Sequence, residues 1–306
     1  MSLSPTLSTQ RARMPHHHDS EATKNSIAGA GAGLVAAIVT CPLDVVKTRL
    51  QNQGLSLPTT AKYPGTRACL VKIWSEEGLR GLYRGLGPTI CGYLPTWAIY
   101  FTAYEAFKSQ ASFYLQKPDS SHQVHIVGAM SAGALCTLST SPLWVIKTRI
   151  MTQSKSTAYR YQNTLDAFYS IYRTEGIRGY YKGLIPSLLG VSHVVVQFPL
   201  YEALKAHLTA VEADGNVHTP LILASSSLSK AFASCLTYPH EVIRTRLQNQ
   251  IIPPYKYAGV VDAVLIISRE EGYRGFYRGL STNLIRTIPA SALTLLTYEL
   301  IINKLN

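Results

Sequence analysis

Six apolar stretches alternate with polar segments along the chain. They cover residues 27–46, 86–107, 124–148, 184–205, 220–246 and 283–302. An α-helix needs about 20 residues to cross the hydrocarbon core of a bilayer, and each stretch reaches that length. The first stretch contains one charged residue, Asp44. The pattern therefore predicts an all-α membrane protein with six transmembrane helices and both termini on one side.

Shorter amphipathic stretches follow the odd-numbered spans. They cover residues 66–74, 163–172 and 259–268, and each leads into a Glu-Gly pair. Glycine readily takes the backbone conformation that ends a helix. An apolar face opposite a polar one is typical of a helix that lies in the membrane interface. We expect three short surface helices, one after each odd-numbered span.

One motif occurs three times. The copies are Pro42-Leu43-Asp44-Val45-Val46-Lys47-Thr48-Arg49, Pro142-Leu143-Trp144-Val145-Ile146-Lys147-Thr148-Arg149 and Pro239-His240-Glu241-Val242-Ile243-Arg244-Thr245-Arg246. Each copy is followed by Glu-Gly and then by an aromatic residue, a base and a glycine. Such recurrence indicates tandem repeats that form one body around a pseudo-threefold axis. We expect a disordered tail at 1–24 and repeats at 25–118, 119–213 and 214–306.

Charge changes this picture by implying an anionic partner. The chain has 29 Lys and Arg against 17 Asp and Glu, a net charge of +12. The mean hydropathy of +0.07 is intermediate, as expected of helices with one lipid face and one polar face. The loops at 52–83, 154–181 and 249–277 hold eleven Lys and Arg, whereas those at 109–121 and 206–219 hold one. This asymmetry places the basic loops on one side of the membrane.

Other classes of protein fit the sequence less well. The chain has no nucleophile–base pair, no carboxylate dyad and no dinucleotide-binding glycine motif after a strand, so we do not expect an enzyme. A soluble nucleic-acid-binding protein would lack six near-spanning apolar runs, so we expect no nucleic-acid partner. The five cysteines form no Cys-x-x-Cys pair, which argues against a disulfide framework or a metal site.

The repeated motifs closely resemble the signature of the mitochondrial carrier family. That signature is Pro-x-acid-x-x-base followed by acid-Gly and aromatic-base-Gly, and the resemblance covers residues 22–305. It implies a six-helix transporter of the inner mitochondrial membrane that works by alternating access, with both termini toward the intermembrane space. It also implies bends in the odd helices at Pro42, Pro142 and Pro239.

The resemblance implies a gate of ion pairs at the matrix end. Residues three apart share a helix face, so acids and bases of neighbouring odd helices could pair around the axis. The expected gate residues are Asp44, Lys47, Lys147, Glu241 and Arg244, with Gln51 and Gln248 bracing the pairs. Trp144 departs from the family pattern because it stands where the second repeat should have an acid. We therefore expect at most two interhelical pairs here.

A second gate is implied at the cytoplasmic end. Its expected residues are Glu105, Lys108, Glu202, Lys205 and Glu299. Ile302 occupies the position of the third base, so this gate too can form only two full pairs. Because a buried pair roughly balances its desolvation cost, modest contacts with a ligand could open such a gate.

The even helices carry the family's substrate contacts near their midpoints. The corresponding residues here are Gly92, Leu189 with Gly190, and Arg286. Gly92 leaves space, Leu189-Gly190 offers an apolar shelf for a planar base, and Arg286 suits a phosphate or carboxylate. Polar or aromatic residues inside the apolar runs add Trp97, His193 and Lys230 as candidates, because intramembrane ionisable groups are often functional.

Within the family, the chain resembles the branch that moves large nucleotide-type solutes. Trp144 and Leu189-Gly190 carry this likeness, together with residues 95–101. We predict exchange of NAD for AMP or ADP, without a cofactor or metal, in a bilayer that could supply cardiolipin. A base on Leu189-Gly190 and a pyrophosphate near Arg286 and Lys230 would also fit UTP or FAD. A pyrimidine nucleotide carrier and an FAD or folate carrier therefore stay open as alternatives.

Overall fold

The computed structural model describes residues 16–54, 63–154, 160–193, 196–197, 199–204, 219–251 and 253–305. Within these ranges the secondary structure is entirely helical. The first repeat contains α1 (His16–Asn52), α2 (Thr66–Leu82) and α3 (Leu86–Leu115). The second contains α4 (His122–Thr152), α5 (Thr164–Glu175), α6 (Ile177–Tyr180), α7 (Leu184–Leu189) and η2 (Gly190–Ser192). The third contains α9 (Thr219–Gln248), α10 (Val260–Glu271), η3 (Tyr273–Tyr277) and α11 (Leu280–Leu305).

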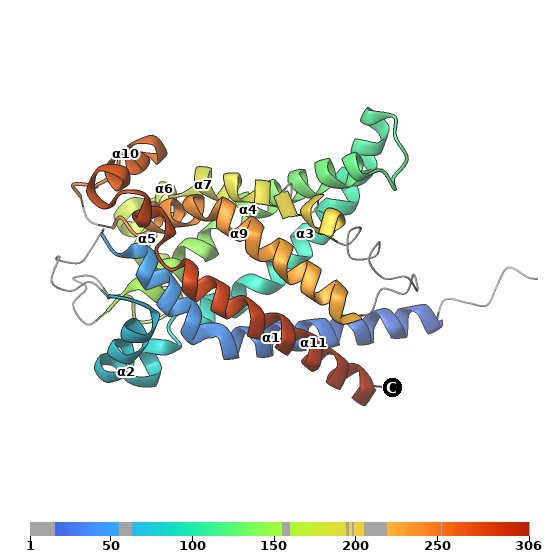
Figure 1. Cartoon of the computed structure of the whole chain (residues 1–306), viewed down its shortest axis with the longest axis horizontal. Coiled ribbons are helices and arrows are strands. Elements are labelled where there is room, and N and C mark those ends of the chain that lie inside the picture. Colours follow the sequence, from blue (N-terminus) through green and yellow to red (C-terminus); the bar gives the residue numbers. More distant parts are fainter. Residues whose placement is uncertain are drawn as a thin grey trace, which may run out of the picture.

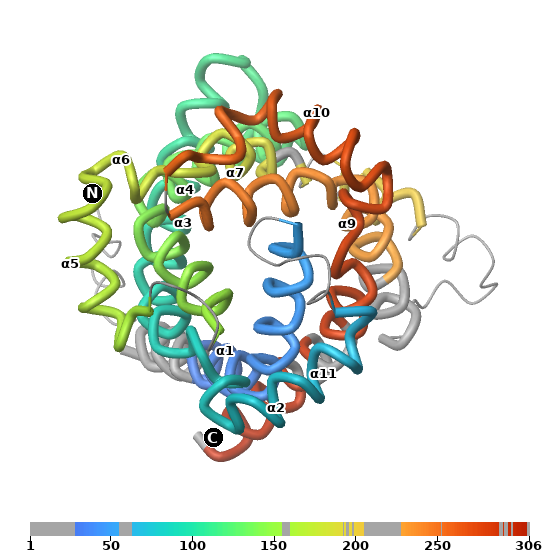
Figure 2. Tube along the Cα trace, turned by 90° about the vertical axis from the view of Figure 1, so that its left-hand side faces the viewer, coloured from blue at the N-terminus to red at the C-terminus, as the bar shows by residue number. Residues whose placement is uncertain are grey.

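The long helices surround a common axis, as the end-on view in Figure 2 shows. The most extensive helix contacts join α3 to α4 and α1 to α11. The contact between α1 and α11 connects the first repeat to the last and closes the ring. Helices α2, α5 and α10 lie outside the ring at one end, on the left of Figure 1. We call this end the surface-helix end.

Each surface helix docks on its own repeat through an apolar stripe with a spacing of four residues. Ala167 and Ile171 of α5 are fully buried and lie in one core with Ile146 and Ile150 of α4. The equivalent buried pairs are Cys69 and Ile73 of α2, and Ala263 and Ile267 of α10. The amphipathic pattern thus produces three copies of one small core.

Glycine ends two of these helices, as the sequence predicts. Gly176 follows α5 with φ 66°, and Gly272 follows α10 with φ 64°. Both conformations fall in the region that favours glycine. The equivalent Gly78 has φ 64° but lies inside α2, which resumes after it and runs to Leu82. The predicted end of α2 is therefore a kink.

The helices extend beyond the apolar stretches that predict them. Helix α1 begins at His16, inside the stretch for which the sequence predicts a disordered tail, and residues 1–15 lie outside the described ranges. Pro42, Pro142 and Pro239 all lie inside helices. Among the described residues, two segments are long and apolar enough to cross a membrane by themselves, Ala28–Asn52 and His122–Thr152. Six membrane spans stay a prediction.

Candidate functional site

A buried triad of charged groups recurs in every repeat at the surface-helix end. In the second repeat, Arg149 Nη2 lies 2.9 Å and Lys182 Nζ 2.6 Å from Glu175 Oε2. The side chains of Arg149 and Glu175 are 0% and 4% exposed. Burial alone would raise the pKa of Glu175, but hydrogen bonds and charges from Arg149 and Lys182 outweigh it and lower the pKa. The equivalent triads are Arg49–Glu77–Arg84 and Arg246–Glu271–Arg278.

The central arginine of each triad also connects one repeat to the next. Arg49 Nε donates to the carbonyl oxygen of Met151 at 3.1 Å. Arg149 Nε donates to that of Gln248 at 2.8 Å, and Arg246 Nε to that of Gln51 at 3.1 Å. These bonds run around the whole ring. Sequence reasoning did not assign the arginines to a site, although the threefold recurrence of Thr-Arg and Glu-Gly was the signal.

Closer to the axis, one predicted gate pair is formed. Lys47 Nζ of α1 lies 2.8 Å from Glu241 Oε1 of α9. Gln51 braces the pair, as predicted, by donating to Glu241 Oε2 at 3.2 Å and to the Tyr238 hydroxyl at 3.0 Å. Its own oxygen accepts from Thr245 Oγ1 at 2.9 Å. These contacts hold the first and third repeats together.

Asp44 does not pair with a base of α4 or α9, the helices that carry the other two copies of the motif. Its Oδ1 lies 3.0 Å from Arg286 Nη1 of α11, so a predicted gate residue and a predicted substrate contact form one ion pair. In the predicted gate, Asp44 would pair with Lys147. In the structure, Lys147 Nζ lies 4.9 Å from the ring centroid of Trp144. Because an aromatic face attracts a cation, Trp144 gives Lys147 a partial substitute for the charge of Asp44.

Because residue 144 is a tryptophan and not an acid, Arg244 and Gln248 each keep a nitrogen without a hydrogen-bond acceptor in the described part of the chain. Among the described residues, Arg244 Nε and Gln248 Nε2 are buried without a hydrogen-bond partner. By analogy with Gln51, Gln248 should brace a pair between Arg244 and residue 144. Trp144 has no carboxylate there, so the prediction that Gln248 braces a pair is wrong.

The opposite end lacks the predicted ion pairs between helices in the part of the chain that the structure describes. Glu105 pairs with Lys108 of its own helix at 3.7 Å, and Glu105 is 71% exposed. Glu202 lies 3.2 Å from His122 Nδ1, a partner that the sequence did not suggest. Glu299 is exposed, and Lys205 lies outside the described residues. Charges therefore cross-link the ring at the surface-helix end, whereas at the opposite end the described residues Glu105 and Lys108 pair with each other within one helix.

Gly92 and Gly190, two of the predicted substrate contacts, are packed against other side chains. Gly92 is buried, and a Cβ there would lie 3.9 Å from Leu143 and Trp144. A Cβ on Gly190 would lie 2.7 Å from His240 Nε2, so His240 covers the backbone that we expected to be open. Leu189, beside it, is 54% exposed.

The remaining candidates differ in how tightly they are held. Trp97 is 54% exposed and stacks on Phe101 of its own helix at 5.5 Å between ring centroids. His193 Nδ1 lies 3.0 Å from Thr237 Oγ1 of α9. Lys230 is exposed. Of the predicted substrate residues, the structure thus links Arg286 directly to the gate.

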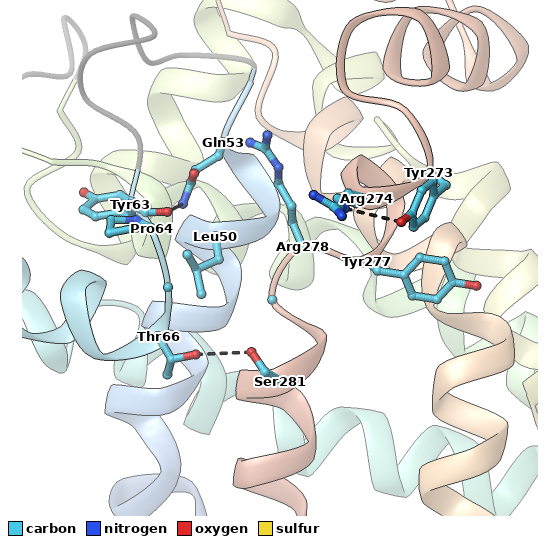
Figure 3. A pocket seen from close by; sticks show the side chains of 12 residues that line it. Leu50, Gln53, Tyr63, Pro64, Thr66, Tyr273, Arg274, Tyr277, Arg278 and Ser281 are labelled. Carbon is cyan, nitrogen blue, oxygen red and sulfur yellow. Dashed lines mark hydrogen bonds between the residues drawn. The ribbon is translucent and has the colours of Figure 1, made fainter.

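A separate pocket of about 740 Å³ opens between the first and third repeats (Figure 3). It lies where α2 and α11 begin, and the Thr66 and Ser281 hydroxyls meet across it at 3.4 Å. Two arginines of the third repeat, Arg274 and Arg278, line it. Its other lining residues are Leu50, Gln53, Tyr63, Pro64, Gly65, Tyr273, Tyr277 and Gly279.

Three homologous helical units, arranged around one axis and joined by charged groups at one end, define a carrier-type protein. The family model for mitochondrial carrier proteins matches residues 18–114, 118–212 and 216–306. The chain therefore belongs to the mitochondrial carrier family, as its motifs suggested, and its three repeats are confirmed.

Curated relatives align with most of the chain. Nicotinamide adenine dinucleotide transporter 1 of Arabidopsis thaliana, a chloroplastic protein, is 45% identical over 90% of this chain and 90% of its own length. Mitochondrial nicotinamide adenine dinucleotide transporter 1 of Saccharomyces cerevisiae is 42% identical over 92% and 76%. Human solute carrier family 25 member 33 is 40% identical over 90% and 92%.

Proposed function

We propose that the protein exchanges NAD for an adenine nucleotide such as AMP or ADP across the inner mitochondrial membrane. The central observation is the charge balance near the axis. Four cations (Lys47, Lys147, Arg244 and Arg286) accompany two acids, Asp44 and Glu241, in this part of the structure. A region with excess positive charge favours an anion, and NAD carries a pyrophosphate. The similarity to curated NAD transporters supports the choice of nucleotide.

The two ends of the ring support alternating access. Lys47–Glu241 joins α1 to α9 at the surface-helix end, whereas among the described residues of the other end Glu105 pairs with Lys108 of its own helix. We assign this arrangement to a state closed toward the matrix and open toward the intermembrane space. In this proposal the chain forms six spans, its basic surface loops face the matrix, and both termini face the intermembrane space.

The substrate would lie between the two gates. Arg286, with Lys230, would bind the phosphates, because guanidinium groups form strong charge-assisted hydrogen bonds with them. Leu189, Gly190 and His193 would form the wall facing a base, and Gly92 and Trp97 would complete the contact from α3. His240 covers Gly190, so it would belong to this wall too.

The pocket in Figure 3 would bind lipid. It combines aromatic rings with Arg274 and Arg278 at the edge where surface helix α2 begins. A cardiolipin headgroup, with two phosphates, matches this mixture of cationic and apolar groups.

Transport in liposomes tests the function. Purified protein in liposomes loaded with AMP should take up labelled NAD, and excess UTP should inhibit weakly. Arg286→Ala should abolish uptake, because it removes the guanidinium proposed to bind the phosphates. Arg67→Ala, which removes an exposed arginine of α2, is the matched control and should keep the wild-type rate. Rapid UTP uptake without NAD uptake would instead indicate a pyrimidine nucleotide carrier.

A further inference from the structure

The ion pair between Lys47 and Glu241 shows which acid each base of the matrix gate should pair with. Lys47 of the first repeat pairs with Glu241 of the third, so each base pairs with the acid of the preceding repeat around the axis. The same step assigns Lys147 to Asp44 and Arg244 to residue 144. Since residue 144 is a tryptophan, Asp44 is the one acid left for both of the remaining cations of the gate.

Asp44 departs from this rule in the structure. It pairs instead with Arg286 on α11 through Oδ1 and Nη1 at 3.0 Å. Among the described residues, Lys147 contacts the face of Trp144 at 4.9 Å, and the charges of Asp44 and Arg286 act on it as well. One carboxylate thus serves two cations, one in the gate and one at the proposed substrate site.

The pair with Arg286 uses little of the guanidinium. Its Nε is buried and has no hydrogen-bond partner among the described residues. The side chains of Asp44 and Arg286 are 13% and 28% exposed, so the pair can still be reached. A phosphate can engage a guanidinium through two nitrogens at once. A nucleotide therefore has the means to compete with Asp44 for Arg286.

We propose that Asp44 is an internal competitor of the substrate. In the empty carrier it holds Arg286, and a bound nucleotide phosphate displaces it to Lys147. The loss of one pair on binding is then offset by the formation of another. The inference rests on the proposed function, because it takes Arg286 as the phosphate contact. It adds that Asp44 is a positioning residue whose partner reports whether substrate is bound.

Equilibrium binding to the purified full-length protein can test this exchange. Neutralising Lys147 with Lys147→Met should weaken NAD binding about three- to fivefold, because displaced Asp44 loses its second partner. Asp44→Asn in the same background should restore the affinity, because the ion pair between Asp44 and Arg286 is then absent. In the presence of Asp44→Asn, Lys147→Met should have no effect on the dissociation constant. Such non-additivity measures the coupling of the two side chains.

A matched control uses the other acid of the ring. Glu241→Gln also removes one negative charge, but Glu241 pairs with Lys47 and not with Arg286. It should not restore the affinity of Lys147→Met, and thermal unfolding of each variant identifies misfolded protein. Equal weakening by Lys147→Met with and without Asp44→Asn would mean that Lys147 contacts the substrate directly, and would overturn the inference.

Parallel titrations separate this inference from the proposed function. NAD, AMP and UTP are titrated into the wild type, and the double-mutant cycle uses the nucleotide that binds. If UTP binds and NAD does not, the NAD function fails, while non-additivity with UTP would still support the competition. If NAD binds and the cycle is additive, the function stands and the competition fails. Binding of none of the three would overturn both.

Discussion

The triad around Glu175 allows a sharp test of what holds the ring together. Glu175→Gln keeps the size of the side chain but removes the charge that Arg149 and Lys182 share. Arg149 is 0% exposed, so the substitution leaves a buried cation without its counter-ion. Removing one partner of a buried ion pair costs about 3–5 kcal/mol. Because glutamine still offers one oxygen acceptor to Arg149, we expect a loss of about 3 kcal/mol.

The exposed pair of Glu105 and Lys108 provides the matched control. Its two charged atoms lie 3.7 Å apart, and Glu105 is 71% exposed. An exposed pair within one helix contributes less than about 0.5 kcal/mol. For a chain of this size, 1 kcal/mol shifts the Tm by roughly 2 °C. Glu175→Gln should therefore lower the Tm of the purified protein by about 6 °C, and Glu105→Gln by about 1 °C or less.

Acidification gives this prediction a second readout. The folded structure lowers the pKa of Glu175, so its stabilising effect is full at neutral pH and is lost as the pH falls through that lowered pKa. Glutamine imitates the protonated acid. The Tm difference between wild type and Glu175→Gln should consequently be constant near pH 7 and shrink below about pH 4. Equal Tm values for the Glu175 and Glu105 variants at pH 7 would refute the reasoning.

Three further predictions concern single positions. Trp144→Glu should raise the Tm by a few degrees by giving Arg244 a carboxylate, and an unchanged Tm would mean that Arg244 cannot reach it. Gly183→Ala should cost about 1–2 kcal/mol, because Gly183 has φ 75° and a Cβ would lie 3.0 Å from the Arg244 carbonyl oxygen. Gly29→Ala, the control inside a helix with open space around it, should not destabilise the protein in thermal unfolding. Cys91 is the one exposed cysteine, so a maleimide should label the wild type once and Cys91→Ser hardly at all.

Several parts of the site were predictable from sequence because the chain repeats. The motif spacing predicts that acids and bases of neighbouring odd-numbered spans pair near the axis, as Lys47 and Glu241 do, and Gln51 contacts Glu241. The Glu-Gly pairs predict where α5 and α10 end, because a glycine with positive φ is a local requirement. Such features depend on neighbours along one helix or on a threefold rule, and both can be read from the sequence.

The predictions that failed concern partners chosen among helices distant in the chain. Asp44 could reach either Lys147 or Arg286, and the sequence does not determine which cation lies closer. Gln248 has the same residue type as Gln51, but its expected pair is absent because Trp144 belongs to another repeat. The covering of Gly190 by His240 likewise depends on how closely α7 and η2 approach α9.

The sequence alone determined the three repeats, the helical class, the surface helices and the family, because these depend on periodicity and on motifs within each repeat. The tertiary structure decided how the charges are shared. It places three buried arginines in a ring of bonds between repeats, joins Asp44 to Arg286, and pairs Glu105 with Lys108 of its own helix. The physical reason is that an ion pair depends on distance and burial, which packing fixes to within an ångström, whereas a sequence pattern specifies only which face of a helix carries the charge.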